Sequence, residues 1–150
     1  MKIALAADHG AYAVKEKVKS YLGACGYEVE DFGTHSTESC DYTDFALLAG
    51  EAVSTGFCER GILLCTTGIG MSIAANKIRG IRAALCTNTL MAALTREHND
   101  TNVLVLGAGI TAELLSLRIV DTWLDTDFTG GERHQRRIDK ITALEGANSL

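Results

Sequence analysis

Short apolar runs and amphipathic stretches alternate along the whole chain, and this alternation narrows the possible folds more than any other feature. Five apolar runs predict strands, at residues 3–7, 27–32, 61–65, 81–86 and 103–106. Helical spacing predicts helices at residues 11–22, 44–54, 70–78, 89–97, 112–124 and 132–144. Apolar strands joined by helices indicate a parallel sheet covered on both faces. We therefore expect one α/β domain over residues 1–150.

Charge and composition argue against several classes of function. The formal net charge is -5, so binding to nucleic acid or to an anionic membrane surface is not expected. No apolar stretch approaches the ~20 residues that span a bilayer. The first apolar run is too short for a signal peptide and is interrupted by Asp8. Five cysteines without a CxxC pair argue against a disulfide framework and a zinc site. We expect a cytoplasmic protein without metal or cofactor.

The segment from Gly61 to Lys77, GILLCTTGIGMSIAANK, carries the clearest chemical signal. It places Cys65 at the carboxyl end of a buried strand, before a Gly-rich loop and a helix of small residues. The backbone amides of residues 66–70 are expected to point outward at the helix N-terminus and to form an anion site. Thiols beside helix N-termini tend to have lowered pKa values, which suits a base or a nucleophile. We expect chemistry on an anionic small molecule.

The same loop allows a second interpretation, as part of a dinucleotide-binding fingerprint. Gly68 and Gly70 supply a GxG pair, but Ile73 replaces the third glycine and no acidic residue ends the next strand. A nucleotide-binding module is therefore a weaker alternative, and it predicts measurable affinity for nucleotides.

Further polar residues are candidates for the same site. Asp8 and His9 follow the first strand and are expected at the carboxyl edge of the sheet, although Asp8 can equally cap the next helix. His98 and Asn99 end a helix, where the dipole favours a protonated imidazole, or they form a simple polar turn. Tyr42 is either a packing residue or a wall against which a ring can stack.

Basic residues cluster on the last predicted helix. Arg133, Arg137 and Lys140 share one face at helical spacing, with Arg136 beside them. Such a cluster usually means a solvated surface. In an acidic protein, guanidinium groups also suit a phosphate clamp, because their forked donors match phosphate oxygens.

These segments together resemble the ribose-5-phosphate isomerase B family, which includes galactose- and allose-6-phosphate isomerases. The resemblance rests on AADHGAY at 6–12, DFGTHSTESCDY at 31–42, CTTGIGMSIAANK at 65–77, GIRAALC at 80–86, REHNDTNVL at 96–104 and GGERHQRR at 130–137. It implies a three-layer α/β/α sandwich with a five-stranded, Rossmann-like parallel sheet. It also implies a homodimer or dimer of dimers whose active sites are shared between subunits. The implied activity is cofactor-independent isomerisation of a phosphorylated sugar, foremost ribose 5-phosphate to ribulose 5-phosphate.

The resemblance also implies roles for individual residues. Cys65 matches the base that abstracts a proton, and Thr67 matches the hydroxyl that handles the substrate oxygens. Asp8 and His98 match the pair that opens the sugar ring. The expected substrate-binding residues are His9, Tyr42, Thr66, Gly68, Gly70, Asn99, Arg133 and Arg137.

Three positions depart from the family pattern, and one of them is Thr43, where a proline commonly follows the tyrosine of the DY motif. Many members have glycine where this chain has Thr66, and many have a phosphate-holding arginine where this chain has Gly109. Other substrates are therefore alternatives: allose 6-phosphate, galactose 6-phosphate or a tetrose phosphate. A non-catalytic subunit of a hetero-oligomeric isomerase is a further alternative, but the presence of all four matched catalytic residues argues against it.

Overall fold

The computed structural model describes residues 1–147, in which five strands alternate with six α-helices. The strands are β1 (Lys2–Ala7), β2 (Glu28–Asp31), β3 (Arg60–Cys65), β4 (Ala83–Leu85) and β5 (Val103–Gly107). The helices are α1 (Tyr12–Ala24), α2 (Tyr42–Ser54), α3 (Ile69–Ala75), α4 (Thr89–Asn99), α5 (Glu113–Asp125) and α6 (Glu132–Ala147), with a 3-10 turn η1 (His9–Ala11) before α1. Every predicted strand and helix is confirmed, with ends displaced by a few residues.

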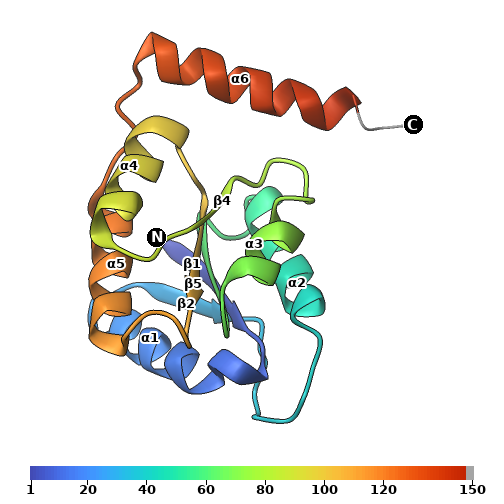
Figure 1. Cartoon of the computed structure of the whole chain (residues 1–150), viewed down its shortest axis with the longest axis vertical. Coiled ribbons are helices and arrows are strands. Elements are labelled where there is room, and N and C mark those ends of the chain that lie inside the picture. Colours follow the sequence, from blue (N-terminus) through green and yellow to red (C-terminus); the bar gives the residue numbers. More distant parts are fainter. Residues whose placement is uncertain (148–150) are drawn as a thin grey trace.

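The five strands form one parallel sheet in the order β2-β1-β3-β5-β4. Helices α1, α4 and α5 cover one face and α2 and α3 cover the other (Figure 1). The predicted three-layer α/β/α sandwich is therefore confirmed. Because all strands are parallel, their carboxyl ends lie at one edge of the sheet, here called the carboxyl edge, and their starts lie at the opposite, amino edge.

Both faces of the central strands are buried, which explains why their sequences are apolar throughout. In β3, Ile62 and Leu64 pack in one core cluster while Leu63 and Cys65 pack in the other. The same alternation occurs in β1 and β5, because successive side chains of a strand point to opposite faces.

A buried lysine in α1 breaks the expected pattern of an apolar inner face. The Lys15 side chain is 0% exposed, and its Nζ lies 2.8 Å from both Oδ atoms of Asp31 at the end of β2. Nζ of Lys19 is 2.7 Å from Asp31 Oδ2. This buried ion pair ties α1 to β2, as a buried charge requires a partner.

Helix α6 lies apart from the sandwich, across the end of the molecule where α4 finishes (Figure 1). Ile138 is its buried anchor, at 6% exposure. A groove of about 500 Å³ separates α6 from the body, and its apolar lining includes Ile78, Ile81, Ile141 and Leu144. Within residues 1–147, every helix is too short or too polar to cross a membrane.

Candidate active site

The ends of β1 and β3 place two of the predicted catalytic residues next to one another at the carboxyl edge. Ala7 of β1 is opposite Leu64 of β3, and Cys65 is opposite Gly107 of β5. The N–H of Asp8 donates to the Leu64 carbonyl oxygen at 3.2 Å. Asp8 and Cys65 are therefore neighbours at the ends of adjacent strands, at the edge where open parallel sheets bind ligands.

The loop after β3 surrounds the Cys65 thiol with backbone. Cys65 is 5% exposed, and the N–H of Gly68 donates to its Sγ at 3.1 Å. Gly68 has a φ of 78°, and a Cβ there would lie 2.4 Å from Leu85 Cδ1. Only glycine fits this turn, which brings the amide back to the sulfur. This hydrogen bond fixes the position of the sulfur at the end of β3.

Two of the loop amides are satisfied within the loop, so for these two the sequence prediction of amides open to an anionic ligand is wrong. The Gly68 amide donates to Cys65, as described, and the Ile69 amide donates to Thr67 Oγ1 at 3.3 Å. Side chains of the loop satisfy these donors locally. Because Thr67 Oγ1 accepts this bond, its own hydrogen remains able to donate to a substrate oxygen.

Asp8 has the capping role that was one of its two predicted interpretations. It is 7% exposed, and its Oδ1 accepts from the Ala11 N–H at 3.2 Å at the start of η1. The cap engages one carboxylate oxygen, which leaves the other able to exchange a proton with a ligand. Capping and catalysis are therefore compatible, since the cap holds the carboxylate beside Cys65.

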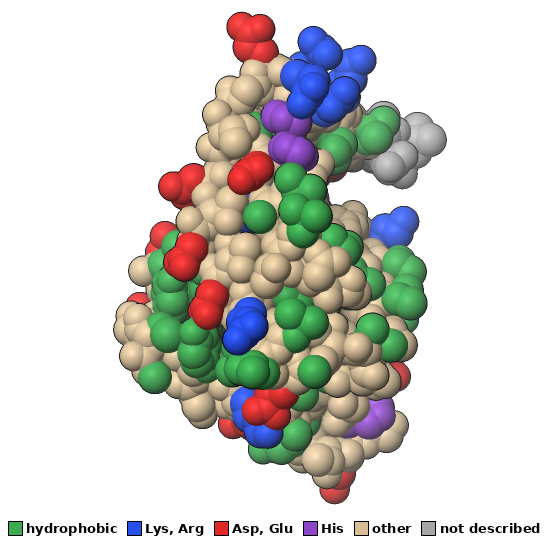
Figure 2. Space-filling model, turned by 60° about the vertical axis from the view of Figure 1, so that its left-hand side comes forward, with side chains coloured by type: hydrophobic (Ala, Val, Ile, Leu, Met, Phe, Trp, Pro, Cys, Tyr) green, Lys and Arg blue, Asp and Glu red, His purple; other side chains and the backbone are tan. Residues whose placement is uncertain are grey.

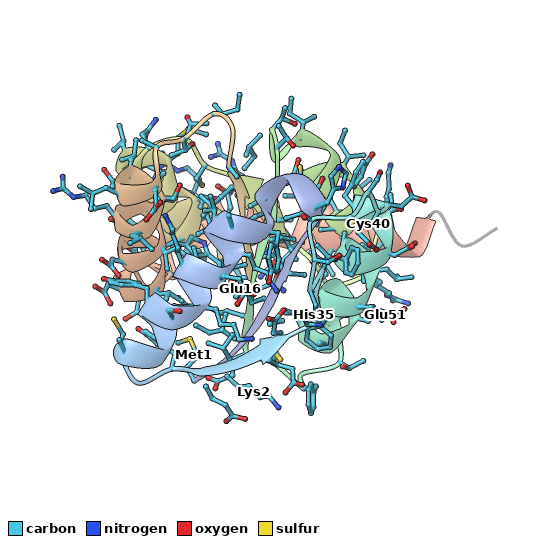
Figure 3. The ribbon with its side chains drawn as sticks, turned by 90° about the horizontal axis from the view of Figure 1, so that it is seen from below. Met1, Lys2, Glu16, His35, Cys40 and Glu51 are labelled. Carbon is cyan, nitrogen blue, oxygen red and sulfur yellow. The ribbon has the colours of Figure 1, made fainter. Side chains whose placement is uncertain are left out.

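His9 is oriented by the loop between β2 and α2. The backbone N–H of Cys40 donates to Nδ1 of His9 at 3.2 Å. Figure 3 views the molecule from the carboxyl edge and labels Cys40 in this loop. Because Nδ1 accepts, the neutral imidazole carries its proton on Nε2, an assignment that follows from the hydrogen-bond network. Nε2 can then donate to a substrate oxygen.

Tyr42 stands over the Gly-rich loop as a wall of the site. A Cβ on Gly70 would lie 2.6 Å from Cζ of the Tyr42 ring. The absence of a side chain at position 70 therefore lets the ring approach the loop. The tyrosine is 39% exposed, which leaves part of the ring open to a ligand.

The remaining predicted residues lie at the amino edge. Helix α4 runs against the direction of the strands, so His98 and Asn99, its last residues, lie next to the start of β5. Arg133 and Arg137 project from α6 and are exposed. Figure 1 shows α6 at the opposite end of the molecule from the loop between β3 and α3.

His98 stacks on His134, a residue that the sequence analysis did not select. Their ring centroids are 4.3 Å apart, and Arg133 Nη2 lies 3.5 Å from His134 Nε2. Partial burial and the nearby charges of His98, Arg133 and Arg137 hold the pKa of His134 below its usual 6.5. Figure 2 shows histidine and basic side chains gathered at this end. The only sequence signal for His134 was its place between arginines, because the stacking is a long-range contact.

Hydrogen bonds join the segment before α6 to α4. Arg96 is 6% exposed, and its Nε donates to the Thr126 carbonyl oxygen at 3.1 Å. Thr129 Oγ1 donates to the Glu97 carbonyl oxygen at 2.9 Å. These contacts place the start of α6 beside His98 and so group its arginines with the histidine.

The candidate site residues of one chain therefore form two separate groups. The carboxyl-edge group comprises Asp8, His9, Tyr42, Cys65, Thr66, Thr67, Gly68 and Gly70. The amino-edge group comprises His98, Asn99, Arg133, His134 and Arg137. The first contains a thiol, a carboxylate and hydroxyl groups, whereas the second concentrates positive charge of the kind that binds phosphate. Within one chain, the two groups do not meet.

Comparisons with known proteins identify the family and support the fold. The profile of the family described as ribose/galactose isomerase matches residues 3–141. Ribose-5-phosphate isomerase B of Escherichia coli (strain K12) is 46% identical over 144 residues, which cover 96% of each chain. The structure of Clostridium thermocellum ribose-5-phosphate isomerase B has a TM-score of 0.98 at 54% identity and covers 99% of this chain and 100% of that one. The Mycoplasma genitalium ribose-5-phosphate isomerase B, solved with bound ribulose-5-phosphate, has a TM-score of 0.93 at 39% identity and covers 97% of this chain and 96% of that one.

The fold and the thiol at its carboxyl edge, with these similarities, define an α/β enzyme of the aldose–ketose isomerase class. The chain belongs to the ribose/galactose isomerase family, as the match over residues 3–141 shows. The resemblance inferred from the separate motifs is thereby confirmed.

Proposed function

We propose that this protein interconverts ribose 5-phosphate and ribulose 5-phosphate without a metal or cofactor. The observation that carries the proposal is the Cys65 thiol, held by the Gly68 amide beside Asp8 at the carboxyl edge. The names of the relatives support the substrate, since the E. coli protein is a ribose-5-phosphate isomerase and the M. genitalium structure contains ribulose-5-phosphate.

The first step opens the sugar ring. Opening needs an acid that protonates the ring oxygen and a base that takes the proton of the anomeric hydroxyl. Asp8 has a carboxylate oxygen outside its cap, and His98 offers an imidazole. These two residues are suited to the step if they face the same substrate.

The second step moves one proton between adjacent carbons. The Cys65 thiolate takes the proton from C2 of the open aldose, which leaves an enediolate, and then returns it to C1 to give the ketose. Negative charge grows on the substrate oxygens during this transfer. The Thr67 hydroxyl is placed to stabilise that charge, and His9 Nε2–H is a second donor.

The amino-edge group supplies the charge that binds phosphate. Arg133 and Arg137 are exposed on α6, and their guanidinium groups form paired hydrogen bonds to phosphate oxygens. Asn99 adds a side-chain amide at the end of α4. In this assignment, the base and the phosphate ligands of one chain lie at opposite edges of its sheet.

We infer that the active form is a homodimer, or a dimer of dimers, in which the carboxyl-edge group of one copy faces the amino-edge group of its partner. Such pairing would bring the two groups together. Exposed apolar side chains support it, since Ile69 and Ile73 flank the first group and Ile141 and Leu144 accompany the second. A cytoplasmic location is also proposed, because five free cysteines fit a reducing compartment.

The direct test is turnover of ribose 5-phosphate by the purified chain in the presence of a chelator. Allose 6-phosphate, galactose 6-phosphate and erythrose 4-phosphate are measured alongside it. We expect clear preference for ribose 5-phosphate. Preference for another sugar would show that this sugar, and not ribose 5-phosphate, is the substrate. No turnover of any of these sugars would favour a non-catalytic subunit. Calorimetry with nucleotides tests the remaining alternative, a nucleotide-binding module.

A further inference from the structure

The side chain of Thr66 fills the gap between the loops that follow β1 and β5. A Cβ on Gly10, after β1, would lie 2.3 Å from Thr66 Oγ1. A Cβ on Gly109, after β5, would lie 3.1 Å from Thr66 Cγ2, and the Gly109 N–H donates to the Thr66 carbonyl oxygen at 2.8 Å. The Thr66 side chain thus occupies the space that side chains at positions 10 and 109 would otherwise enter.

This gap is the crevice in which ligands of such sheets bind. Strands β1 and β5 lie on either side of β3, so the loops after them form the walls above the end of β3. Thr66 follows Cys65 directly and is itself exposed. Its side chain therefore stands between the two walls, with its remaining surface open to a ligand.

Both branches of Thr66 lie close to a glycine, which restricts rotation of the side chain. The hydroxyl faces Gly10 and the methyl faces Gly109. A β-branched residue has two heavy atoms on Cβ, so a change of χ1 would move one of them against a wall. The gap therefore has a definite size that depends on this residue.

The same space adjoins the catalytic groups. The Cβ position of Gly10 that lies close to Thr66 Oγ1 is also 3.4 Å from Asp8 Oδ1. A sugar that presents C2 to Cys65 and its oxygens to Asp8 must therefore pass the Thr66 side chain. The bulk of that side chain shortens the crevice available to the rest of the substrate.

We propose that Thr66 sets the length of the sugar phosphate, admitting five-carbon substrates and excluding six-carbon ones. The inference rests on the isomerase activity proposed above. Steric exclusion of one extra carbon is typically worth about 10- to 200-fold in kcat/KM. The discrimination attributable to Thr66 is expected within this range.

The test compares kcat/KM for ribose 5-phosphate and allose 6-phosphate in three proteins: wild type, Thr66→Ala and Thr66→Val. Alanine removes both branches, whereas valine keeps the shape. We expect Thr66→Ala to raise the ratio of allose to ribose 5-phosphate activity by about 10-fold or more. Thr66→Val should keep the ratio near that of wild type. An unchanged ratio in Thr66→Ala, with a wild type active on ribose 5-phosphate, would overturn this inference alone. A wild type inactive on both sugars would overturn the proposed function as well.

A double-mutant cycle with Gly10→Ala tests the packing itself. In the wild-type background, the new methyl group meets Thr66 Oγ1, so we expect a lowered thermal midpoint and an altered substrate ratio. In the Thr66→Ala background, the nearest remaining neighbours are Asp8 Oδ1 at 3.4 Å and the residue 66 Cβ at 3.6 Å, which are ordinary contacts. Gly10→Ala should therefore be tolerated there. Equal effects in both backgrounds would show that Thr66 does not fill this gap.

Discussion

The imidazole rings of His98 and His134 stack with their centroids 4.3 Å apart and their planes 9° apart. Positive charge near one ring opposes protonation of that ring, which agrees with the lowered pKa of His134. We expect His134 to orient the ring of His98.

The lowered pKa of His134 predicts a pH dependence of stability. A histidine whose pKa is below 6.5 in the folded state binds fewer protons there than in the unfolded state. Its stabilising contribution is therefore present above about pH 6.5 and is lost as the pH falls through the lower, folded pKa. We expect His134→Asn to flatten the loss of urea-unfolding free energy between about pH 7 and pH 5. His35→Asn, in an exposed loop, is the control, and equal slopes in both variants would contradict the prediction.

Replacement of Cys65 by alanine should remove catalysis and retain binding. Loss of a general base typically lowers kcat by about 10²- to 10⁴-fold. Calorimetry should show ribose 5-phosphate affinity within a few-fold of wild type, because the phosphate ligands are unchanged. Cys25→Ala, which alters an exposed thiol, serves as the control and should remain fully active. Normal turnover by Cys65→Ala would eliminate the thiol as the base.

Complementation between inactive variants tests whether sites are shared. Cys65→Ala and His98→Asn each inactivate both sites of a homodimer. In a mixed dimer, one site combines the intact Cys65 of one copy with the intact His98 of the other. Refolding an equal mixture should therefore restore about a quarter of wild-type activity. If activity does not return although mixed dimers form, each site is built within one chain.

The basic face of α6 predicts a selective effect on phosphorylated substrates. Arg137→Ala removes one charge-assisted contact, worth about 1.5–3 kcal/mol, so KM for ribose 5-phosphate should rise roughly 10- to 100-fold. The activity of Arg137→Ala on unphosphorylated ribose should equal that of wild type. Lys140→Ala, on the same face, is the matched control. An equal effect of Arg137→Ala on both sugars would show that the arginine does not bind phosphate.

The buried pair of Lys15 and Asp31 predicts strong coupling. Burial by itself raises the pKa of Asp31, but hydrogen bonds from Lys15 and Lys19 bring it below its usual 3.8, so its contribution is lost in acid. Removal of one partner from a buried pair costs about 3–5 kcal/mol, as expected for Lys15→Met. The double variant Lys15→Met/Asp31→Leu should cost less than the sum of the two single variants. Additive losses in urea unfolding would contradict the coupling.

Local pattern was enough to predict the elements and the carboxyl-edge group. An apolar run is a property of neighbouring residues and can be read from the sequence. Because both faces of β3 are buried, its residues are apolar throughout, and this run predicts a strand. In a parallel sheet the carboxyl ends of all strands lie at the same edge, so the sequence could predict that Asp8 and Cys65 lie there together. The separate motifs were also sufficient to identify the family.

The sequence by itself therefore determined the fold class and the family, and it supplied the candidate site residues apart from His134. Only the tertiary structure decided how these residues are distributed: the stacking of His134 on His98, the burial of Lys15, the seat of Thr66 between two glycines, and the division of the site between opposite edges. The physical reason is distance along the chain. Periodicity and motifs report what adjacent residues do, whereas these contacts form between segments that meet only when the helices pack on the sheet.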